Sequence, residues 1–249
     1  MSVWYQTQGH GPDLVLVHGW GMHAGVWQPW LPMLIQHFRV TLPELPGHGA
    51  SPLLSTALSD WSEACLAVAP RRAIWLGWSL GGLVALQAAR LAPERISQLC
   101  LMASTPRFVQ TGDWLTAVPA AVFAQFADTL CADPATTLRR FLSLQIQGSE
   151  RMVAILRCLQ QALAQRPAAD LNGLTAGLNL LLQTDLRVEL AQSAVPSTWL
   201  FGGRDTLVPA AVADHLPDCC ATWQLPTAAH APFLTHPAEC SAWLEPFRG

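Results

Sequence analysis

The stretch GWSLGG around Ser79 constrains the fold of this chain more than any other. An apolar run, IWLG, leads into it, and the following LGGLVALQAARLA has the apolar spacing of a helix. A strand that turns directly into a helix at Ser79 needs small residues two positions before and after it, because a Cβ there would strike neighbouring backbone. Gly77 and Gly81 meet this need, and Gly82 lets the helix lie close to the sheet. The sequence therefore predicts a strained elbow that presents the Ser79 hydroxyl at a strand end.

Apolar strands alternate with helices over the first hundred residues. The strand-like runs there are DLVLVHG, RVTLPELPGHG, RRAIWLGWS and ISQLCLMAS. STWLFGGRD and ATWQLPTAAH resume the pattern after Pro196, and HPAECSAWLEPF is expected to form a closing helix. Buried strands separated by helices favour a mainly parallel sheet with right-handed crossovers, so the predicted fold class is α/β.

The segment between these two regions has a different pattern. Four stretches have amphipathic helical spacing, with no convincing strand between them: VPAAVFAQFADTLCA, PATTLRRFLSLQIQG, SERMVAILRCLQQALAQ and DLNGLTAGLNLLLQ. We therefore expect an α/β core of residues 1–106 and 188–249, interrupted by a helical cap of residues 107–187. A chain of 249 residues can form one large domain with such an insertion.

The expected elbow predicts a base and an acid further along the chain. A serine hydroxyl becomes a good nucleophile only with a base that is itself held by a carboxylate, and on such an elbow the chain order is Ser, acid, His. Asp205 follows an apolar strand and a Gly-Gly turn, and His230 ends the strand-like ATWQLPTAAH. His236 is the alternative base, whereas His215 falls within an expected helix and should face solvent. The predicted catalytic residues are Ser79, Asp205 and His230.

The oxyanion of a tetrahedral intermediate needs two hydrogen-bond donors. The backbone N–H of Leu80, directly after the serine, is one expected donor. The loop VLVHGWG supplies the other, with Trp20 as the expected donor. We interpret His18 as a brace for this loop rather than as a base, and assign no chemistry to Glu44 or to the GHG turn that follows it.

Composition excludes several classes of function. Hydrophobic residues make up 51% of the chain, yet no apolar run approaches the ~20 residues of a membrane span. The first residues lack the basic start and long apolar run of a signal peptide, so we expect a cytoplasmic protein. We also expect a monomer. The net charge of −3 argues against nucleic-acid binding. The seven cysteines lack C-x-x-C spacing, so we expect buried reduced thiols and no metal, and no motif implies an organic cofactor.

Taken in order, HGWG, GWSLGG, GGRDTLVP and AAHAPFLTHP resemble the α/β-hydrolase superfamily, over roughly residues 10–105 and 190–249. The tryptophans of HGWG and WLGWSLGG, with RRFLSLQ and AAHAPFLTHPAE, make nearly the whole chain similar to the pimeloyl-[acyl-carrier protein] methyl ester esterases of biotin synthesis. The resemblance implies an α/β-hydrolase fold with a helical cap. It also implies hydrolysis, through an acyl-enzyme, of the methyl ester on the distal carboxyl of a pimeloyl chain. The implied substrate-binding residues are Trp20, Ser79, Leu80, Phe141, Leu142, Ser143, Leu144, Gln145 and His230.

The resemblance further implies a protein partner, the acidic acyl carrier protein that bears the substrate. Residues 136–167 contain five arginines and one glutamate, a local charge of 5 − 1 = +4 on a chain of net charge −3. Arg140 and Arg157 match carrier-contacting positions of the family, whereas two other such positions hold threonine and valine here. Arg151 is expected to compensate. The alternative is a solvated basic surface without a partner.

Other functions stay open at this point. A related capped hydrolase (a carbon–carbon bond hydrolase, an arylesterase or a lactonase) would carry the same triad, because the triad specifies acyl transfer rather than a substrate. A non-catalytic ligand receptor on the same fold is a further alternative, although no triad or oxyanion residue is visibly altered. The side chains of Phe141, Leu142 and Leu144 favour a medium apolar chain as substrate, but packing of the cap alone would also require them.

Overall fold

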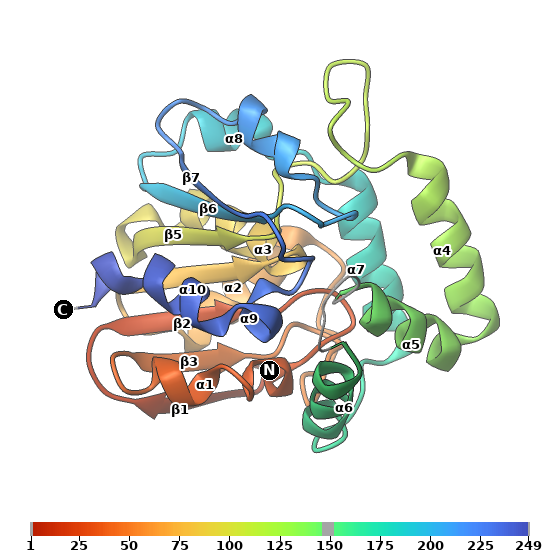
Figure 1. Cartoon of the computed structure of the whole chain (residues 1–249), viewed down its shortest axis with the longest axis horizontal. Coiled ribbons are helices and arrows are strands. Elements are labelled where there is room, and N and C mark those ends of the chain that lie inside the picture. Colours follow the sequence, from red (N-terminus) through yellow and green to blue (C-terminus); the bar gives the residue numbers. More distant parts are fainter. Residues whose placement is uncertain (1, 146–151, 249) are drawn as a thin grey trace.

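The computed structural model describes residues 2–145 and 152–248, apart from the side chain of Leu144. Over this part of the chain a seven-stranded sheet forms the centre of the molecule, in the order β1-β3-β2-β4-β5-β6-β7 (Figure 1). Only β1 is antiparallel to its neighbour, and all other neighbouring strands are parallel. The strands are β1 (Tyr5–Gly9), β2 (Asp13–Val17), β3 (Arg39–Pro43), β4 (Ala73–Trp78), β5 (Ile96–Met102), β6 (Ser197–Gly202) and β7 (Ala221–Leu225). The predicted α/β class with a mainly parallel sheet is confirmed.

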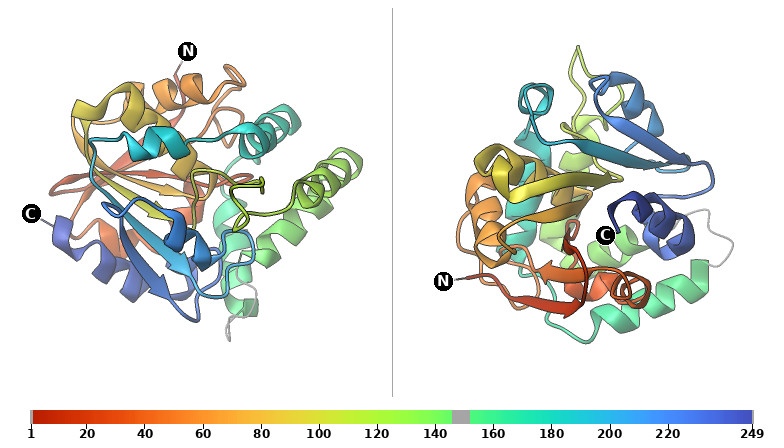
Figure 2. Two further views of the ribbon diagram at one scale, coloured as in Figure 1. Left: turned by 90° about the horizontal axis from the view of Figure 1, so that it is seen from above. Right: turned by 90° about the vertical axis from the view of Figure 1, so that its left-hand side faces the viewer.

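Helices cover both faces of this sheet. The α-helices are α1 (Leu31–Leu34), α2 (Leu58–Val68), α3 (Leu80–Leu91), α4 (Ala120–Ala132), α5 (Pro134–Leu144), α6 (Met152–Leu163), α7 (Leu171–Gln183), α8 (Arg187–Ala191), α9 (Pro232–Thr235) and α10 (Pro237–Trp243). Helices α2, α3 and α8 lie on one face, and α1, α9 and α10 on the other (Figures 1 and 2). Each face has its own buried apolar cluster.

Strand β4 shows why its sequence forms a central strand. Its six residues are all buried, because helices cover the sheet on both sides. Side chains alternate between the two faces: Trp75 belongs to the cluster under α2 and α3, and Leu76 to the cluster under α1 and α10. The near-continuous apolar run is therefore what a strand buried on both faces requires.

Helices α4 to α7 lie between β5 and β6 in the chain and stand beside the sheet rather than on either face (Figures 1 and 2). Each lies within one of the four stretches predicted to be helical. Within residues 107–145 and 152–185, the segments around these helices contain three isolated β-bridges: Arg107 with Asp185, Val109 with Val118, and Thr111 with Trp114.

Two strands differ from the sequence prediction. Strand β1 was not predicted, because YQTQG is an edge strand whose residues are mostly exposed and therefore carries no apolar run. Strand β7 ends at Leu225, so the prediction of a strand that runs to His230 was wrong. Pro226 follows directly and has no N–H for the ladder, and the chain turns away there.

Among the described helices, none has both the length and the apolar character needed to cross a membrane. The expectation of buried thiols holds for Cys65, Cys100, Cys220 and Cys240, all without a disulfide. It was wrong for Cys131, Cys158 and Cys219, which are exposed. The first two are on the solvent sides of α4 and α6, and the third lies in the turn before β7.

Candidate active site

The elbow at Ser79 has the strained backbone that its glycines predict. Ser79 lies between β4 and α3 with φ 55° and ψ −122°, a region that residues with a side chain rarely adopt. A Cβ on Gly77 would collide with the carbonyl oxygen of Gly81, and one on Gly81 would collide with that of Val17. A Cβ on Gly82 would meet the side chain of Ser104. Each glycine is therefore required by close backbone or helix packing.

Hydrogen bonds hold the elbow in this conformation. The Ser79 N–H donates to the carbonyl of Met102 at 3.1 Å, at the end of the neighbouring strand β5. The Ser79 carbonyl accepts from the Ser104 hydroxyl and from the Gly82 N–H, both at 2.8 Å. The Ser79 side chain is left to point out of the elbow.

The structure brings Ser79, His230 and Asp205 into one hydrogen-bonded chain. The Ser79 Oγ lies 2.9 Å from His230 Nε2, and His230 Nδ1 lies 2.8 Å from Asp205 Oδ2. All three side chains are buried, so water competes little for these bonds. Asp205 Oδ1 accepts from the backbone N–H groups of Leu207 and Val208, at 2.8 and 3.0 Å, which fixes the carboxylate. This is the geometry that a serine nucleophile with its base requires.

The other two downstream histidines lie elsewhere. The ring of His236 is hydrogen-bonded to two threonines. Its Nε2 lies 2.9 Å from the hydroxyl of Thr227, and its Nδ1 lies 2.7 Å from that of Thr235. His215 is exposed at the end of a short 3₁₀ helix, Ala210–His215. Neither ring therefore contacts Ser79.

The loop after β2 lies against the serine. A Cβ on Gly19 would come within 3.2 Å of the Ser79 Cβ, a tight contact that glycine avoids. Trp20 follows, and its backbone N–H and that of Leu80 make no backbone hydrogen bond within the described ranges. Neither N–H is therefore committed to a backbone partner in this part of the chain.

The Trp20 side chain connects this loop to the inserted helices. The indole N–H donates to the Leu174 carbonyl in α7 at 2.8 Å. The rings of Phe126 and Phe141 pack edge-on against it, with centroids 5.2 and 5.0 Å away. The Trp20 side chain therefore packs against residues of α4, α5 and α7.

The five predicted cap contacts have different environments. Phe141 packs on Trp20, while Leu142 packs in the cluster on the α1 face. Ser143 is exposed, and its hydroxyl donates to the Arg139 carbonyl in its own helix. Gln145 is fully buried, and its carbonyl accepts from the Ala231 N–H at 2.9 Å, directly after His230. The side chain of Leu144 is outside the described part of the chain.

The predicted docking arginines are only partly described. Arg140 in α5 and Arg157 in α6 are both exposed. Arg151 lies outside the described residues. Arg166, counted in the basic segment, instead forms an ion pair with the fully buried Glu44 and lies 3.4 Å from the centroid of the Trp4 ring. It therefore contributes little to an exposed basic surface.

Sequence reasoning missed the connection made by Glu44. Besides Arg166, this carboxylate accepts from the backbone N–H groups of Ala24 and Ala50, at 3.3 and 2.7 Å. His23, directly before Ala24, is hydrogen-bonded to the Leu163 carbonyl at 3.0 Å, and burial lowers the pKa of His23. Glu44 thus connects the segment after Trp20 to the segment between α6 and α7. The partners are 122 residues apart in the chain, and no local pattern pairs them.

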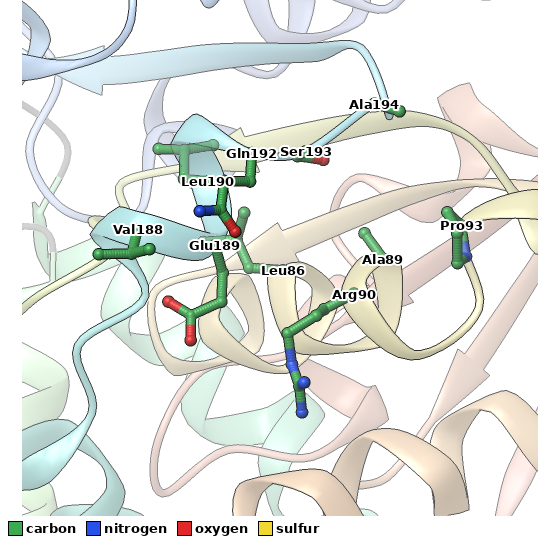
Figure 3. A pocket seen from close by; sticks show the side chains of 10 residues that line it. All are labelled: Leu86, Ala89, Arg90, Pro93, Val188, Glu189, Leu190, Gln192, Ser193 and Ala194. Carbon is green, nitrogen blue, oxygen red and sulfur yellow. The ribbon is translucent and has the colours of Figure 1, made fainter.

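A separate surface cavity of about 420 Å³ lies between α3 and α8 (Figure 3). Leu86, Ala89 and Arg90 line it, about two turns or more along α3 from Ser79, so it is distinct from the site. No group of three or more His, Cys, Asp or Glu residues in the described ranges could hold a metal ion.

Comparison with known proteins identifies the family of this chain. A model of the alpha/beta hydrolase family matches residues 14–243. The chain belongs to the α/β hydrolase family. It is 42% identical over 244 residues to the pimeloyl-[acyl-carrier protein] methyl ester esterase of Methylococcus capsulatus, covering 95% of this chain and 94% of that protein. The protein of the same name from Xanthomonas oryzae pv. oryzae is 44% identical over 243 residues, 96% of each chain. Among solved structures, an esterase from Exiguobacterium antarcticum superposes with a TM-score of 0.88 at 18% identity, over 98% of this chain and 94% of that one, and supports the fold alone.

Proposed function

We propose that this chain is a serine carboxylesterase that hydrolyses the methyl ester of pimeloyl-[acyl-carrier protein]. The observation that carries the chemistry is the hydrogen-bonded chain from Ser79 through His230 to Asp205. The choice of substrate is supported by relatives of that name at 42–44% identity over nearly the full length. The reaction needs no metal and no organic cofactor.

The reaction proceeds in two balanced halves. His230 Nε2 takes the Ser79 proton as Oγ attacks the ester carbonyl, and the N–H groups of Trp20 and Leu80 stabilise the oxyanion. Collapse expels the methoxy group, which leaves as methanol with the proton from His230. Water, deprotonated by the same ring, then attacks the acyl-enzyme carbonyl. The bond to Ser79 Oγ breaks, His230 returns the proton to Oγ, and the carboxylate is freed. Asp205 keeps the proton-bearing Nδ1 in place throughout.

We place the substrate beside the elbow, against Trp20 and Phe141, whose rings pack together. Gln145, whose carbonyl accepts from the Ala231 N–H, joins α5 to the His230 loop. In this proposal the residues from Phe141 to Gln145 contact the acyl chain.

We also propose that residues 107–187 form a cap on a core of residues 1–106 and 188–249. The β-bridge between Arg107 and Asp185, with an ion pair of 2.7 Å between their side chains, closes the base of this insertion. Acyl carrier protein is the proposed partner of its basic surface. The cytoplasmic location and the monomeric state stay predictions.

Release of methanol from methyl-pimeloyl-[acyl-carrier protein] tests the function directly. The wild type should release methanol, and Ser79→Ala should be about 10³-fold slower or more at unchanged thermal stability, because the nucleophile is lost. A panel with an aryl ester, a lactone and an aromatic dienoate tests the related hydrolases. Turnover of one of these with none of the carrier-bound ester would refute the proposal, and absence of turnover on every substrate would indicate a receptor.

A further inference from the structure

Two adjacent cysteines lie in the turn that leads into β7. The Cys220 N–H donates to the Pro217 carbonyl at 2.8 Å, which closes a four-residue turn with Cys219 and Cys220 at its third and fourth positions. Cys219 is exposed, whereas Cys220 is buried and packs in the apolar cluster on the α2 and α3 face. The turn therefore presents one thiol to solvent directly beside a second thiol that is fixed by packing.

Residues of β6 surround the sulfur of Cys220. The Ser197 hydroxyl donates to Cys220 Sγ at 3.3 Å, and the indole N–H of the buried Trp199 donates to Ser197 Oγ at 3.1 Å. Burial raises the pKa of the Cys220 thiol, the Ser197 hydroxyl opposes this, and the Cys219 thiol raises the pKa further. The two thiols must lie close together for one to act on the other in this way.

A disulfide is a poor link between these two residues. The peptide bonds described are all trans, so the two Cα atoms are about 3.8 Å apart. The Cα atoms of ordinary disulfides are about 4.4 Å apart or more. The pair therefore resists direct S–S closure and stays a dithiol, whereas one larger atom inserted between the sulfurs relaxes this constraint.

We propose that Cys219 and Cys220 form a binding site for a monosubstituted trivalent arsenical. Arsenic(III) forms three bonds, and the organic group takes one of them, so two soft thiolates complete its coordination. A structural zinc ion needs about four ligands, and no group of three or more His, Cys, Asp or Glu residues in the described ranges could hold a metal ion. The site is independent of the proposed function, because Ser197 begins β6, whereas Asp205 follows the other end of that strand.

The reaction with phenylarsine oxide is balanced without an oxidant or a reductant. Two As–S bonds replace the two As–O bonds of the arsenical, and the oxygen leaves with the two thiol protons as one molecule of water. Arsenic stays trivalent throughout. Both thiols are consumed, so a second equivalent of the arsenical has no dithiol left at this turn.

The other cysteines of the chain do not offer this pair. Cys131 on α4 and Cys158 on α6 are exposed, but neither has another cysteine beside it in the sequence. Burial raises the pKa of Cys65 to about 12 and also raises the pKa of Cys100 and Cys240. A reagent for single thiols should therefore modify Cys131 and Cys158 as well, whereas the arsenical should select the turn before β7.

Intact-mass spectrometry of the reduced full-length protein with an equimolar amount of phenylarsine oxide tests this site. The wild type should gain one phenylarsenic group with loss of one water, and a thiol titration should show that two thiols are lost. An excess of 2-mercaptoethanol should leave the adduct in place, because a single thiol competes poorly with two that are held together. The dithiol 1,2-ethanedithiol should remove it.

Cys219→Ser and Cys220→Ser should each weaken arsenical binding about 10²-fold or more, because the second As–S bond is lost. The matched control, Cys131→Ser with Cys158→Ser, removes two exposed thiols and should bind as the wild type does. Thermal unfolding shows whether Cys220→Ser still folds, and the exposed Cys219→Ser carries the test if it does not.

Wild-type affinity in Cys219→Ser would overturn the proposal, as would an adduct on the wild type that 2-mercaptoethanol removes. Loss of the adduct in the Cys131→Ser, Cys158→Ser variant would place the arsenical on those helices instead.

Discussion

At the residue scale, the site depends on how firmly His230 is held. Its carbonyl accepts from the Trp78 indole N–H at 2.7 Å, and the next residue, Ala231, donates to the Gln145 carbonyl at 2.9 Å. Asp205 fixes the ring from the remaining side. Because β7 has ended five residues earlier, these contacts, rather than a strand, position the ring opposite Ser79.

Substitution of each histidine distinguishes the proposed base from its neighbour. His230→Ala should lower kcat about 10³-fold or more, and combination with Ser79→Ala should add little, because one proton relay is lost in either case. His236→Ala should be mild, since that ring bonds only Thr227 and Thr235. Steady-state kinetics on one ester measures both. If His236→Ala were the more damaging change, the assignment of the base would be wrong.

At the element scale, charged side chains join the two ends of the inserted segment. Asp185, before α8, accepts from Arg107 at 2.7 Å and from Arg187 at 2.8 Å, and Arg187 also reaches Asp113 at 3.0 Å. Hydrogen bonds from Arg187 lower the pKa of Asp185 to about 2 and raise the pKa of Arg187. These contacts hold the start of the segment against its end.

The depressed pKa of Asp185 predicts a pH-dependent stability. A carboxyl of pKa about 2 in the folded state and 3.8 ordinarily stabilises the fold fully above the ordinary value, and this contribution disappears as the pH falls toward 2. Asp185→Asn should lower Tm at pH 7 by about 2–4 °C, the shift for ~1 kcal/mol in a domain of this size. Its Tm should also fall less steeply than that of the wild type between pH 4 and pH 2.

The control for this comparison is Asp218→Asn, which removes the same charge from an exposed residue that forms no ion pair within the described ranges. It should leave Tm at pH 7 nearly unchanged. Parallel Tm curves for Asp185→Asn and the wild type over the acid range would show that the ion pairs do not stabilise the fold.

At the scale of the whole molecule, the sequence predicted what is encoded locally. The elbow follows from three glycines and a serine, and the strands and helices of the core follow from apolar runs and helical spacing. Ser79 and Asp205 follow β4 and β6, so their place at the carboxyl edge of the parallel sheet could be predicted. His230 was placed at the same edge by a strand prediction that was wrong, because β7 ends at Leu225. Edge strand β1 has no apolar run, and the Glu44–Arg166 pair joins residues distant in the chain, so neither was predicted. The direction of Arg166, which turns back onto the core, likewise depends on the tertiary structure.

Because Arg166 points back onto the core, fewer arginines are left to contact the proposed carrier protein. With Arg166 paired to Glu44, the described arginines of the segment that stay exposed are Arg139, Arg140 and Arg157. If an acidic carrier protein docks on them, Arg140→Glu with Arg157→Glu should raise KM for the carrier-bound methyl ester about tenfold or more at low salt. The difference from the wild type should shrink as salt screens the attraction. Hydrolysis of p-nitrophenyl acetate should barely change.

The matched control is Arg71→Glu with Arg72→Glu, an exposed pair directly before β4 and so at the opposite end of that strand from Ser79. It changes the net charge by the same amount, so any effect of overall charge on carrier binding should be equal in the two double variants. A rise in KM confined to the cap pair would therefore locate the contact on the cap. An equal rise in both would indicate long-range attraction without a docking surface, and a loss on both substrates in the cap pair would mean damage to α5 and α6. If KM did not change for the cap pair, the proposal that the carrier protein docks on this surface would be wrong.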